Sequence, residues 1–359
     1  MEESDQSAAL KSQVIAALSN NKAIELRGGG SKRFYGRATS GDEVTIETTG
    51  HAGVVNYAPT ELVITARSGT RIQHINQVLA EQGQQLPFEP PEMHGYATLG
   101  GTLATGFSGP ARPWNGAARD HILGTRIING RGEMLHFGGE VMKNVAGYDV
   151  SRLMVGAMGT LGLILEASLK VLPRPVVETS LAFHMERDEA LAFMIGLGHR
   201  PLPVTGAAFY GDMVYLRLSG SEAGLAAALS ELGGDELPSS GEVWRSLREF
   251  EHPFFKTPLP VWRIALPALS MPELPGEVLI DWAGGQWWLR SDAKPETVRT
   301  LVTAVGGHAT LFRGGDREQE VFHPLPPAMQ ALQERIRRAF DPSGLFNPGR
   351  LTTAALQTH

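Results

Sequence analysis

Residues 27–36 read RGGGSKRFYG and directly follow Ala23-Ile24-Glu25-Leu26, a short apolar run typical of a strand. Three consecutive glycines leave the backbone bare where that strand should end, and glycine accepts the positive φ angles that aim successive N–H groups inward. N–H groups arranged in this way bind anions. The loop therefore predicts a phosphate or diphosphate site, with Gly29 at positive φ and Lys32 as an exposed charge contact. A flexible turn would explain a glycine triplet taken alone equally well.

The loop matches neither of the common phosphate-binding signatures. The G-x-x-x-x-G-K-[ST] pattern of P-loop proteins is absent, and so is a G-x-G-x-x-G turn that opens a helix. The expected contacts are therefore those of the loop itself, which are Gly28, Gly29, Gly30, Ser31 and Lys32.

Two further stretches combine glycine with small residues. GYATLGGTLATGFSGP (95–110) places Gly100 and Gly101 where a flat aromatic ring can approach the backbone. GAMGTLGLI (156–164) puts glycines directly before an apolar strand. Taken singly, the first stretch is also explained by close helix–strand packing, and the second by a tight turn.

Composition narrows the class of protein. The chain has 359 residues, enough for about two domains of roughly 150 residues each. Its net charge of −6 gives no indication of a nucleic-acid surface. The absence of cysteine excludes disulfides, cysteine nucleophiles and iron–sulfur clusters held by this chain. The opening MEESDQSAALKSQ lacks the apolar core of a signal peptide, and no apolar run is long enough to predict a membrane span.

Periodicity predicts the elements of the first half of the chain. A helix is expected at 8–20 and strands at 23–26, 43–47 and 61–66. Thr70-x-x-Gln73 has the form of a capping box for a helix that ends near Gly83. Residues 123–137 predict a hairpin through Asn129-Gly130, and Asp149 is expected to cap a helix through Met158 before a strand at 162–172.

The Pro-Arg-Pro sequence at 173–175 marks a change of pattern. Beyond it the sequence predicts a smaller α+β region, with strands near 178–184, 204–210 and 213–218 and helices at 186–197 and 221–232. EVLIDWA and QWWLR are expected to pair around Ala283-Gly284-Gly285, and a helix is expected at 327–340. Trp282, Trp287 and Trp288 are interpreted as core or subunit-interface residues, and Arg335, Arg337 and Arg338 as a solvated helix face.

The three glycine segments, in this order and spacing, resemble the FAD-binding domain of the vanillyl-alcohol oxidase/p-cresol methylhydroxylase flavoprotein family. FDPSGLFNPGR (340–350) is similar to the carboxy-terminal signature of that family. KNVAGYDVSRLMVGAMGTLG (143–162) resembles its D-lactate/glycolate dehydrogenase branch. VFHPLPP (321–327) and a short second domain are most similar to the FAD-binding small subunits of bacterial glycolate oxidases.

The resemblance implies an α+β, two-domain flavoprotein with a p-cresol methylhydroxylase-type FAD-binding domain. Residues 1–175 would form that domain, 176–325 a smaller α+β cap on the substrate side, and 326–359 a segment returning to the FAD domain. FAD would be non-covalent, because Ser31 stands where covalently flavinylated relatives often carry histidine. The implied FAD-binding residues are Gly28, Gly29, Gly30, Ser31, Lys32, Thr98, Leu99, Gly100, Gly101, Ala104, Thr105, Ser108, Gly109, Gly159, Gly162, Ile164, Asn347 and Arg350.

The function implied by the resemblance is that of an FAD-binding subunit in a cytoplasmic glycolate oxidase complex, which the other subunits would bring to the inner face of the cell membrane. The complex would oxidise glycolate to glyoxylate and pass electrons through flavin to an iron–sulfur subunit. A larger homologous flavin subunit is the other expected partner, and the substrate is a small 2-hydroxy acid. The alternatives are a stand-alone FAD-dependent 2-hydroxyacid dehydrogenase and a flavin-free assembly subunit.

Candidates for catalysis are few. Arg313 and His323 lie in the segment that leads to the expected flavin-proximal terminus. The alternatives are Lys143, Asn144, Tyr148 and Asp149, the last of which is also the expected helix cap. No metal site is expected, because His252, His308 and His323 are scattered without the His-rich metal motif that the resemblance implies for the larger subunit.

Overall fold

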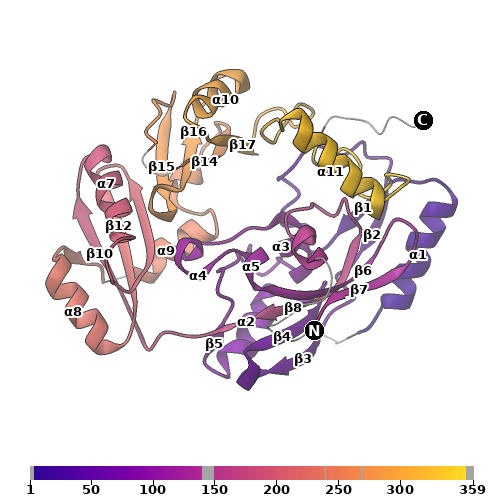
Figure 1. Cartoon of the computed structure of the whole chain (residues 1–359), viewed down its shortest axis with the longest axis horizontal. Helices are drawn as coiled ribbons and strands as arrows, with labels where there is room; N and C mark the ends of the chain where they lie inside the picture. Colours follow the sequence, from indigo (N-terminus) through magenta and orange to yellow (C-terminus); the bar gives the residue numbers. More distant parts are fainter. Residues whose placement is uncertain (1–3, 140–148, 239, 268–269, 353–359) are drawn as a thin grey trace. The chain divides into compact units, whose positions relative to one another are not determined.

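The computed structural model describes residues 4–139, 149–238, 240–267 and 270–352. They form two compact units. The first unit contains the described parts of Met1–Phe107, Ala117–Pro173 and Asp316–His359, and the second contains those of Ser108–Gly116 and Arg174–Gly315. Both units mix helices with strands, so the chain is a two-domain α+β protein (Figure 1). Three bounds differ from the expected ones: Ser108–Gly116 joins the second unit, the chain leaves the first unit after Pro173 and not after 175, and it returns there at Asp316.

A five-stranded antiparallel sheet forms the centre of the first unit. Its strand order is β3-β4-β8-β6-β7, with β3 (Val54–Ala58), β4 (Val63–Arg67), β8 (Leu163–Lys170), β6 (Ile122–Ile128) and β7 (Met134–Gly138). The expected hairpin is confirmed, since β6 and β7 pair from Gly124 opposite Gly138 to Ile128 opposite Met134. Two residues each of β5 (Gln84–Gln85) and β9 (Leu172–Pro173) form a separate antiparallel pair.

A second small sheet carries the glycine-rich loop. The predicted strands at 23–26 and 43–47 are β1 (Ile24–Arg27) and β2 (Val44–Glu47), and the structure pairs them in parallel. The predicted helix at 8–20 is α1 (Ser7–Ser19). Leu10 and Val14 of α1, Ile24, Ile46 and Leu165 belong to one buried apolar cluster, which joins this small sheet to the central one.

Between α1 and the carboxy-terminal segment, the helices of the first unit are short. They are α2 (Ile72–Ala80), α3 (Leu99–Thr105), α5 (Ala118–His121) and α6 (Val150–Met154), with the 3-10 turn η1 (Pro59–Glu61). The predicted capping box is wrong: Arg71 is the N-cap of α2, and the Thr70 hydroxyl instead donates to the Gly53 carbonyl at 3.1 Å. Asp149 does cap α6 by accepting from Arg152 N–H, but this helix ends at Met154 and not at Met158.

The second unit is built on an eight-stranded antiparallel sheet. The strand order is β13-β10-β12-β11-β15-β16-β14-β17. The strands are β10 (Val177–His184), β11 (Val204–Tyr210), β12 (Met213–Gly220), β13 (Asp235–Glu236), β14 (Val261–Ala265), β15 (Glu277–Asp281), β16 (Gln286–Arg290) and β17 (His308–Arg313). The helical segments are α4 (Arg112–Asn115), α7 (Arg187–Leu197), α8 (Glu222–Leu232), α9 (Ser240–Arg248), η2 (Pro253–Phe255), η3 (Trp282–Gly284) and α10 (Pro295–Ala304). The predicted pairing of EVLIDWA with QWWLR is confirmed by β15 and β16, and Trp282, Trp287 and Trp288 are core residues.

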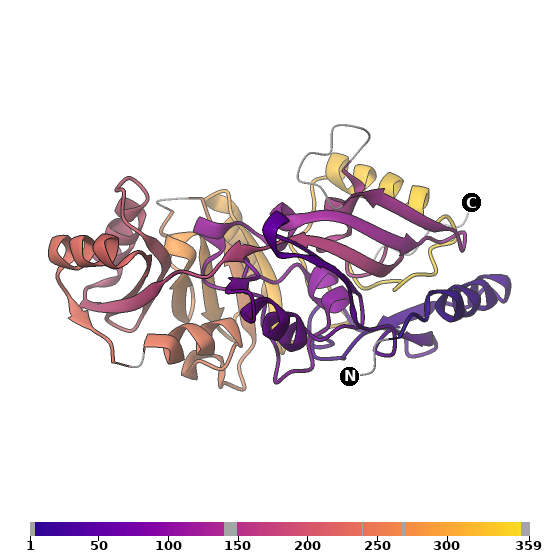
Figure 2. The ribbon, with the colours of Figure 1, turned by 90° about the horizontal axis from the view of Figure 1, so that it is seen from below.

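The carboxy-terminal part returns to the first unit. Its helix α11 (Pro327–Phe340) occupies the predicted range and lies along strands of the first unit in Figure 2. The Phe340 ring at the end of α11 meets that of Phe137 in β7, with ring centroids 6.2 Å apart. After α11, Phe346 forms a parallel bridge with Ile24 at the start of β1. None of the helices in the described ranges combines the length and the apolar character that a bilayer span needs.

Candidate cofactor site

A cavity of about 890 Å³, part of it open to solvent, lies within the first unit where β1 ends. Most of its wall comes from four stretches of chain: β1 with the loop to Arg33, α3 with its N-cap, residues 158–164, and the carboxy-terminal pair Asn347 and Arg350. Thr48 and Ser68 complete it. Segments remote in sequence thus converge on one hollow.

The glycine loop has no room for side chains at its first two positions. A Cβ on Gly28 would lie 2.3 Å from Thr98 Oγ1, and a Cβ on Gly29 would lie 1.7 Å from the Tyr96 carbonyl oxygen. Positive φ occurs at Gly30, with φ 71°, and not at Gly29. The expectation for Gly29 is therefore corrected: this residue is required by close backbone approach and not by its φ angle.

Lys32 is the second correction within the loop. The side chain was expected to be an exposed contact, but the residue is only 7% exposed and its ammonium donates to Thr102 Oγ1 at 3.3 Å. Thr102 is itself fully buried in α3. Lys32 lines the cavity, so its charge acts where water is scarce and electrostatic attraction is stronger.

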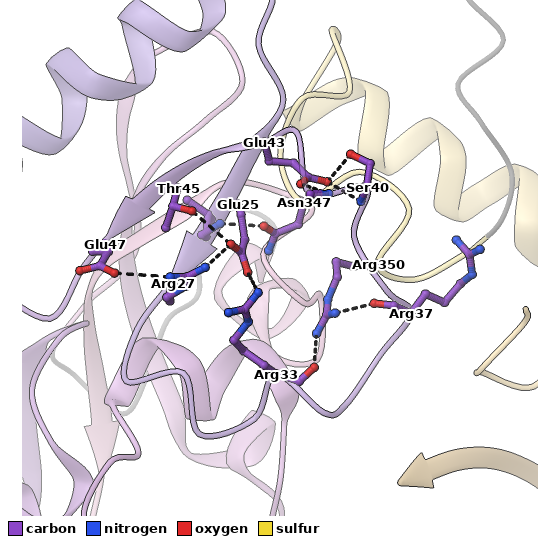
Figure 3. Close-up of polar contacts among 12 residues, drawn as sticks. Glu25, Arg27, Arg33, Arg37, Ser40, Glu43, Thr45, Glu47, Asn347 and Arg350 are labelled. Atoms are coloured by element: carbon purple, nitrogen blue, oxygen red, sulfur yellow. Dashed lines mark hydrogen bonds and ion pairs between the residues drawn. The ribbon is translucent and has the colours of Figure 1, made fainter. Parts of the chain in front are cut away.

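A carboxylate between two arginines borders the loop, as Figure 3 shows. The Glu25 carboxylate lies 2.6 Å from Arg27 Nη2 and 3.2 Å from Arg33 Nη2, and it accepts from Thr45 Oγ1 at 3.2 Å. Arg27 also lies 3.6 Å from Glu47, a side chain that is largely exposed. Glu25 thereby fixes two cations at the cavity wall, because opposite charges and a shared hydrogen-bond acceptor hold both guanidinium groups.

Asn347 joins the carboxy-terminal segment to the cavity wall. Its Oδ1 accepts from Leu26 N–H at 2.8 Å, and its Nδ2 donates to the Met158 carbonyl at 2.6 Å. Its backbone φ of 42° is left-handed, which asparagine tolerates better than most residues. Gly159 leaves space for this side chain, since a Cβ there would lie 2.5 Å from Asn347 Nδ2.

Arginine side chains fix the far end of the glycine loop by donating to backbone carbonyls. Arg350 donates to the carbonyls of Arg37 and, at 3.4 Å, Arg33 (Figure 3). It also donates to the carbonyl of Tyr35, and Arg317 donates to that of Phe34. Arg37 donates in return to the Gly349 carbonyl at 2.8 Å. Burial lowers the pKa of Arg350, and burial together with the charge of Arg350 lowers that of Arg317 to about 10.

The two other glycine-rich stretches contribute differently from one another. A Cβ on Gly100 would lie 2.8 Å from Ser68 Cβ, so part of the need for small residues at 95–110 comes from packing against the turn after β4. Gly162, with φ 136°, passes close to the Ile128 carbonyl oxygen at the start of β8. Both glycines also line the cavity. Close packing and contact with a ligand are therefore compatible explanations of the small residues in these stretches.

The cavity wall contains all the expected FAD-binding residues except three. Leu99 is buried at the start of α3 without lining the cavity, and Ser108 and Gly109 belong to the second unit. The wall also contains residues that the sequence did not single out, which are Glu25, Leu26, Arg27, Arg33, Thr48, Ser68, Met158 and Leu163. The sequence did contain a signal for the charged pair: Glu25 and Arg27 alternate along the strand that enters the glycine turn, so both side chains lie on the same face of it.

None of the described candidates for catalysis, Arg313, His323 and Asp149, is part of the cavity wall. Arg313 lies in the second unit and His323 in the first. Lys143, Asn144 and Tyr148 lie outside the described residues. Within the ranges that the structure describes, no three acidic or histidine side chains converge in a way that would hold a metal ion.

Comparison with known proteins identifies the class that this fold and cavity define. Residues 5–138 match a protein family described as an FAD binding domain, so the first unit is an FAD-binding domain. A solved structure of alkyldihydroxyacetonephosphate synthase superposes with a TM-score of 0.65 at 16% identity, covering 94% of this chain and 74% of that one. The overall fold is therefore shared with that structure.

Two curated relatives narrow the family. The chain is 46% identical over 352 residues to "Glycolate oxidase subunit GlcE" of Escherichia coli K12, covering 98% of this chain and 99% of that protein. It is 31% identical over 131 residues to "Glycolate oxidase subunit GlcD" of Bacillus subtilis 168, covering 36% of this chain and 28% of that protein. The chain belongs to the glycolate oxidase subunit GlcE family.

Proposed function

We propose that this chain is the FAD-binding small subunit of a glycolate oxidase complex, with the first unit as a p-cresol methylhydroxylase-type FAD domain. The observation that carries the proposal is the cavity at the end of β1, found in a chain 46% identical over almost its whole length to a glycolate oxidase subunit. The wall of that cavity includes bare glycine backbone, a buried lysine and three arginines. This combination suits the diphosphate of a dinucleotide.

The lining residues fit FAD held without a covalent bond. The backbone at Gly28 and Gly29 would approach the diphosphate closely, and Lys32 would neutralise part of its charge. The bare backbone of Gly101 and Gly159 would leave space for the flat flavin ring. Among the described lining residues none is His, Cys or Tyr, the side chains that would offer a nucleophile for attachment to the flavin. These features support non-covalent FAD.

Oxidation of a 2-hydroxy acid needs three tasks performed around the cofactor. FAD supplies the acceptor for the hydride that leaves the hydroxyl-bearing carbon. The protein must fix the substrate carboxylate, for which arginine is the best side chain, and must remove the hydroxyl proton with a base or a metal-bound site. The described cavity wall offers no histidine base, and its single carboxylate, Glu25, is engaged by Arg27 and Arg33.

The missing base supports a division of labour with other subunits. A glycolate oxidase subunit of the GlcD type shares part of the same domain with this chain. The present chain has no cysteine to hold an iron–sulfur cluster, so electrons leaving its flavin by that route need a separate protein. We therefore assign this chain to FAD binding and electron transfer, beside a larger flavin subunit and an iron–sulfur subunit.

The test is purification of the chain alone and with its co-expressed partners. The isolated chain should be yellow, and acid denaturation should release the flavin into the supernatant. Anaerobic addition of glycolate should bleach the flavin of the complex rapidly and that of the isolated chain poorly.

Three outcomes would contradict parts of the proposal. A colourless chain that still assembles with its partners would indicate a flavin-free assembly subunit. Colour retained in the acid precipitate would show covalent FAD. Rapid and complete bleaching of the isolated chain would make it a stand-alone dehydrogenase.

A further inference from the structure

Two buried polar atoms at the cavity wall find no hydrogen-bond partner among the residues that the structure describes. They are the hydroxyl oxygen of Ser68, a residue that is 1% exposed, and Nε of Arg27. Both residues line the cavity. A buried donor or acceptor without a partner lowers stability, so native proteins rarely keep one without a reason, and a ligand is one such reason. The two atoms therefore indicate where a polar part of the ligand contacts the wall.

A neighbouring hydroxyl of the wall is already bonded within the protein, since Thr48 Oγ1 donates to the Arg27 carbonyl at 3.3 Å. Ser68 differs, although its backbone is held on both sides. Its N–H donates to the Leu165 carbonyl at 2.7 Å, and its carbonyl accepts from Gly100 N–H at 2.8 Å. The fold thus fixes the position of Ser68 and leaves its hydroxyl for a molecule in the cavity.

The charge of Arg27 is already balanced within a cluster that Figure 3 shows. Its Nη2 lies 2.6 Å from Glu25 and its Nη1 lies 3.6 Å from Glu47, while Arg33 lies 3.2 Å from the same Glu25. Two carboxylates face two guanidinium groups, so this cluster has no excess positive charge for a phosphate. The Nε–H of Arg27 is a single remaining donor, which suits an uncharged acceptor. The charge of a diphosphate is left to the glycine loop and Lys32.

Thr48 joins the two atoms along one wall. Its N–H donates to the Arg27 carbonyl at 2.8 Å, and its carbonyl oxygen would lie 2.0 Å from a Cβ on Gly69, the residue after Ser68. Thr48 itself lines the cavity. A ligand along this wall meets a guanidinium donor and then a hydroxyl, which both donates and accepts. Sugar hydroxyls match the two, because each can accept one hydrogen bond and donate another.

We propose that Arg27 and Ser68 bind hydroxyl groups in a sugar part of the cofactor and so position it in the cavity. The proposal rests on the proposed function in taking FAD as the ligand, whereas the two unsatisfied atoms are features of the first unit alone. FAD offers the same chemistry twice, in the ribose of its adenosine and in the ribityl chain of its flavin. Ligands that lack one set of hydroxyls distinguish the two sources.

The experiment is a calorimetric titration of the full chain, freed of flavin, with FAD and with two analogues. One analogue lacks the hydroxyls of the ribose, and the other lacks those of the ribityl chain. Ser68→Ala and Arg27→Lys should each weaken FAD binding about three- to tenfold, as expected for the loss of one hydrogen bond. The original chain should bind one analogue more weakly than FAD, and each substitution should reduce that difference because the bond is already lost. The analogue concerned identifies the sugar.

Matched controls come from the same unit and lie outside the cavity wall. Ser168 is a buried serine of β8 whose hydroxyl is hydrogen-bonded, and the side chain of Arg126 is 30% exposed, close to the 28% of Arg27. Ser168→Ala should lower the melting temperature, but it and Arg126→Lys should each change FAD affinity less than about twofold. Ser68→Ala should leave the melting temperature of the flavin-free chain unchanged, because it removes a hydroxyl that has no partner within the described protein.

Three outcomes would overturn this proposal alone. They are FAD affinity unchanged in both Ser68→Ala and Arg27→Lys, equal binding of FAD and both analogues by the original chain, and a preference for FAD over an analogue that persists in full in both variants. No saturable binding of FAD by the original chain would overturn the proposed function, and this proposal with it.

Discussion

Asn347 is the single side chain on which the return of the carboxy-terminal segment depends most directly. Replacing Asn347 by Ala removes the bonds to Leu26 N–H and to the Met158 carbonyl. Leaving a buried polar group unsatisfied costs about 1–3 kcal/mol, so the two losses together should cost about 2–4 kcal/mol, because Leu26 N–H is only partly buried. Alanine at a left-handed φ adds roughly 1 kcal/mol.

A conservative variant and a matched control separate the contribution of the two hydrogen bonds from that of the left-handed backbone. Asn347→Asp keeps the acceptor for Leu26 N–H but sets a carboxylate oxygen against the Met158 carbonyl. Its cost should therefore shrink as pH falls and the new carboxyl gains a proton that it can donate. Asn21→Ala is the control for backbone strain, because Asn21 is exposed with a similar φ of 48°. It should cost only the roughly 1 kcal/mol of the left-handed conformation.

The assay is urea unfolding followed by the fluorescence of released flavin. This signal reports on the first unit by itself, which matters because a chain of two units need not unfold in a single step. The free energy of unfolding is obtained from the midpoint and slope of that transition. If Asn347→Ala released its flavin at the same urea concentration as Asn21→Ala, the two side-chain bonds would contribute nothing and the reasoning would be refuted.

Three other predictions concern the same unit. Gly159→Ala should lower flavin affinity at least about tenfold, equivalent to ~1.4 kcal/mol, because its Cβ would meet Asn347 Nδ2; Gly156→Ala, with a similar positive φ and open space around it, should have a much smaller effect on flavin absorbance. Lys32→Ala removes a buried charge and should weaken FAD binding about 10–100-fold. Arg33→Ala, at a side chain that is 57% exposed, should change FAD affinity by about threefold or less, and equal effects of the two substitutions would contradict the buried role of Lys32. Burial lowers the pKa of His51 from 6.5. The unfolded chain therefore takes up the proton first, and the free energy of unfolding should decrease as pH falls below 6.5. A urea midpoint with the same pH dependence in His51→Gln would contradict this.

The sequence predicted the elements well where the pattern is local. The parallel strands β1 and β2, the hairpin of β6 and β7, and the helix α11 were all visible as runs of apolar residues bounded by turn residues. Thr70 shows where local patterns mislead. Its spacing to Gln73 has the form of a capping box, but the hydroxyl forms two bonds with Gly53, a residue of a different turn. A tertiary contact with Gly53 has therefore replaced the local contact with Gln73 that the capping box predicted.

The candidate site also combines features that a local sequence pattern predicts with features that depend on remote residues. Glycine positions could be predicted because a bare backbone leaves a direct mark in the sequence, although the reason for Gly29 came from Tyr96, which lies far along the chain. The burial of Lys32 could not be predicted, since it depends on α3 packing over the loop and on the hydroxyl of Thr102.

The bond between Leu26 and Asn347 spans 321 positions of the chain, and this has a consequence for the order of events during synthesis. The glycine loop leaves the ribosome long before the asparagine and arginine that complete its cavity. The second unit, most of it encoded between them, has time to fold first as an inserted domain, since domains fold as units during synthesis. A nascent chain halted before residue 347 would thus expose an unfinished cavity. Cofactor loading is then expected only after residues 347–350 have been made, and free FAD would stabilise the first unit once this segment has closed it.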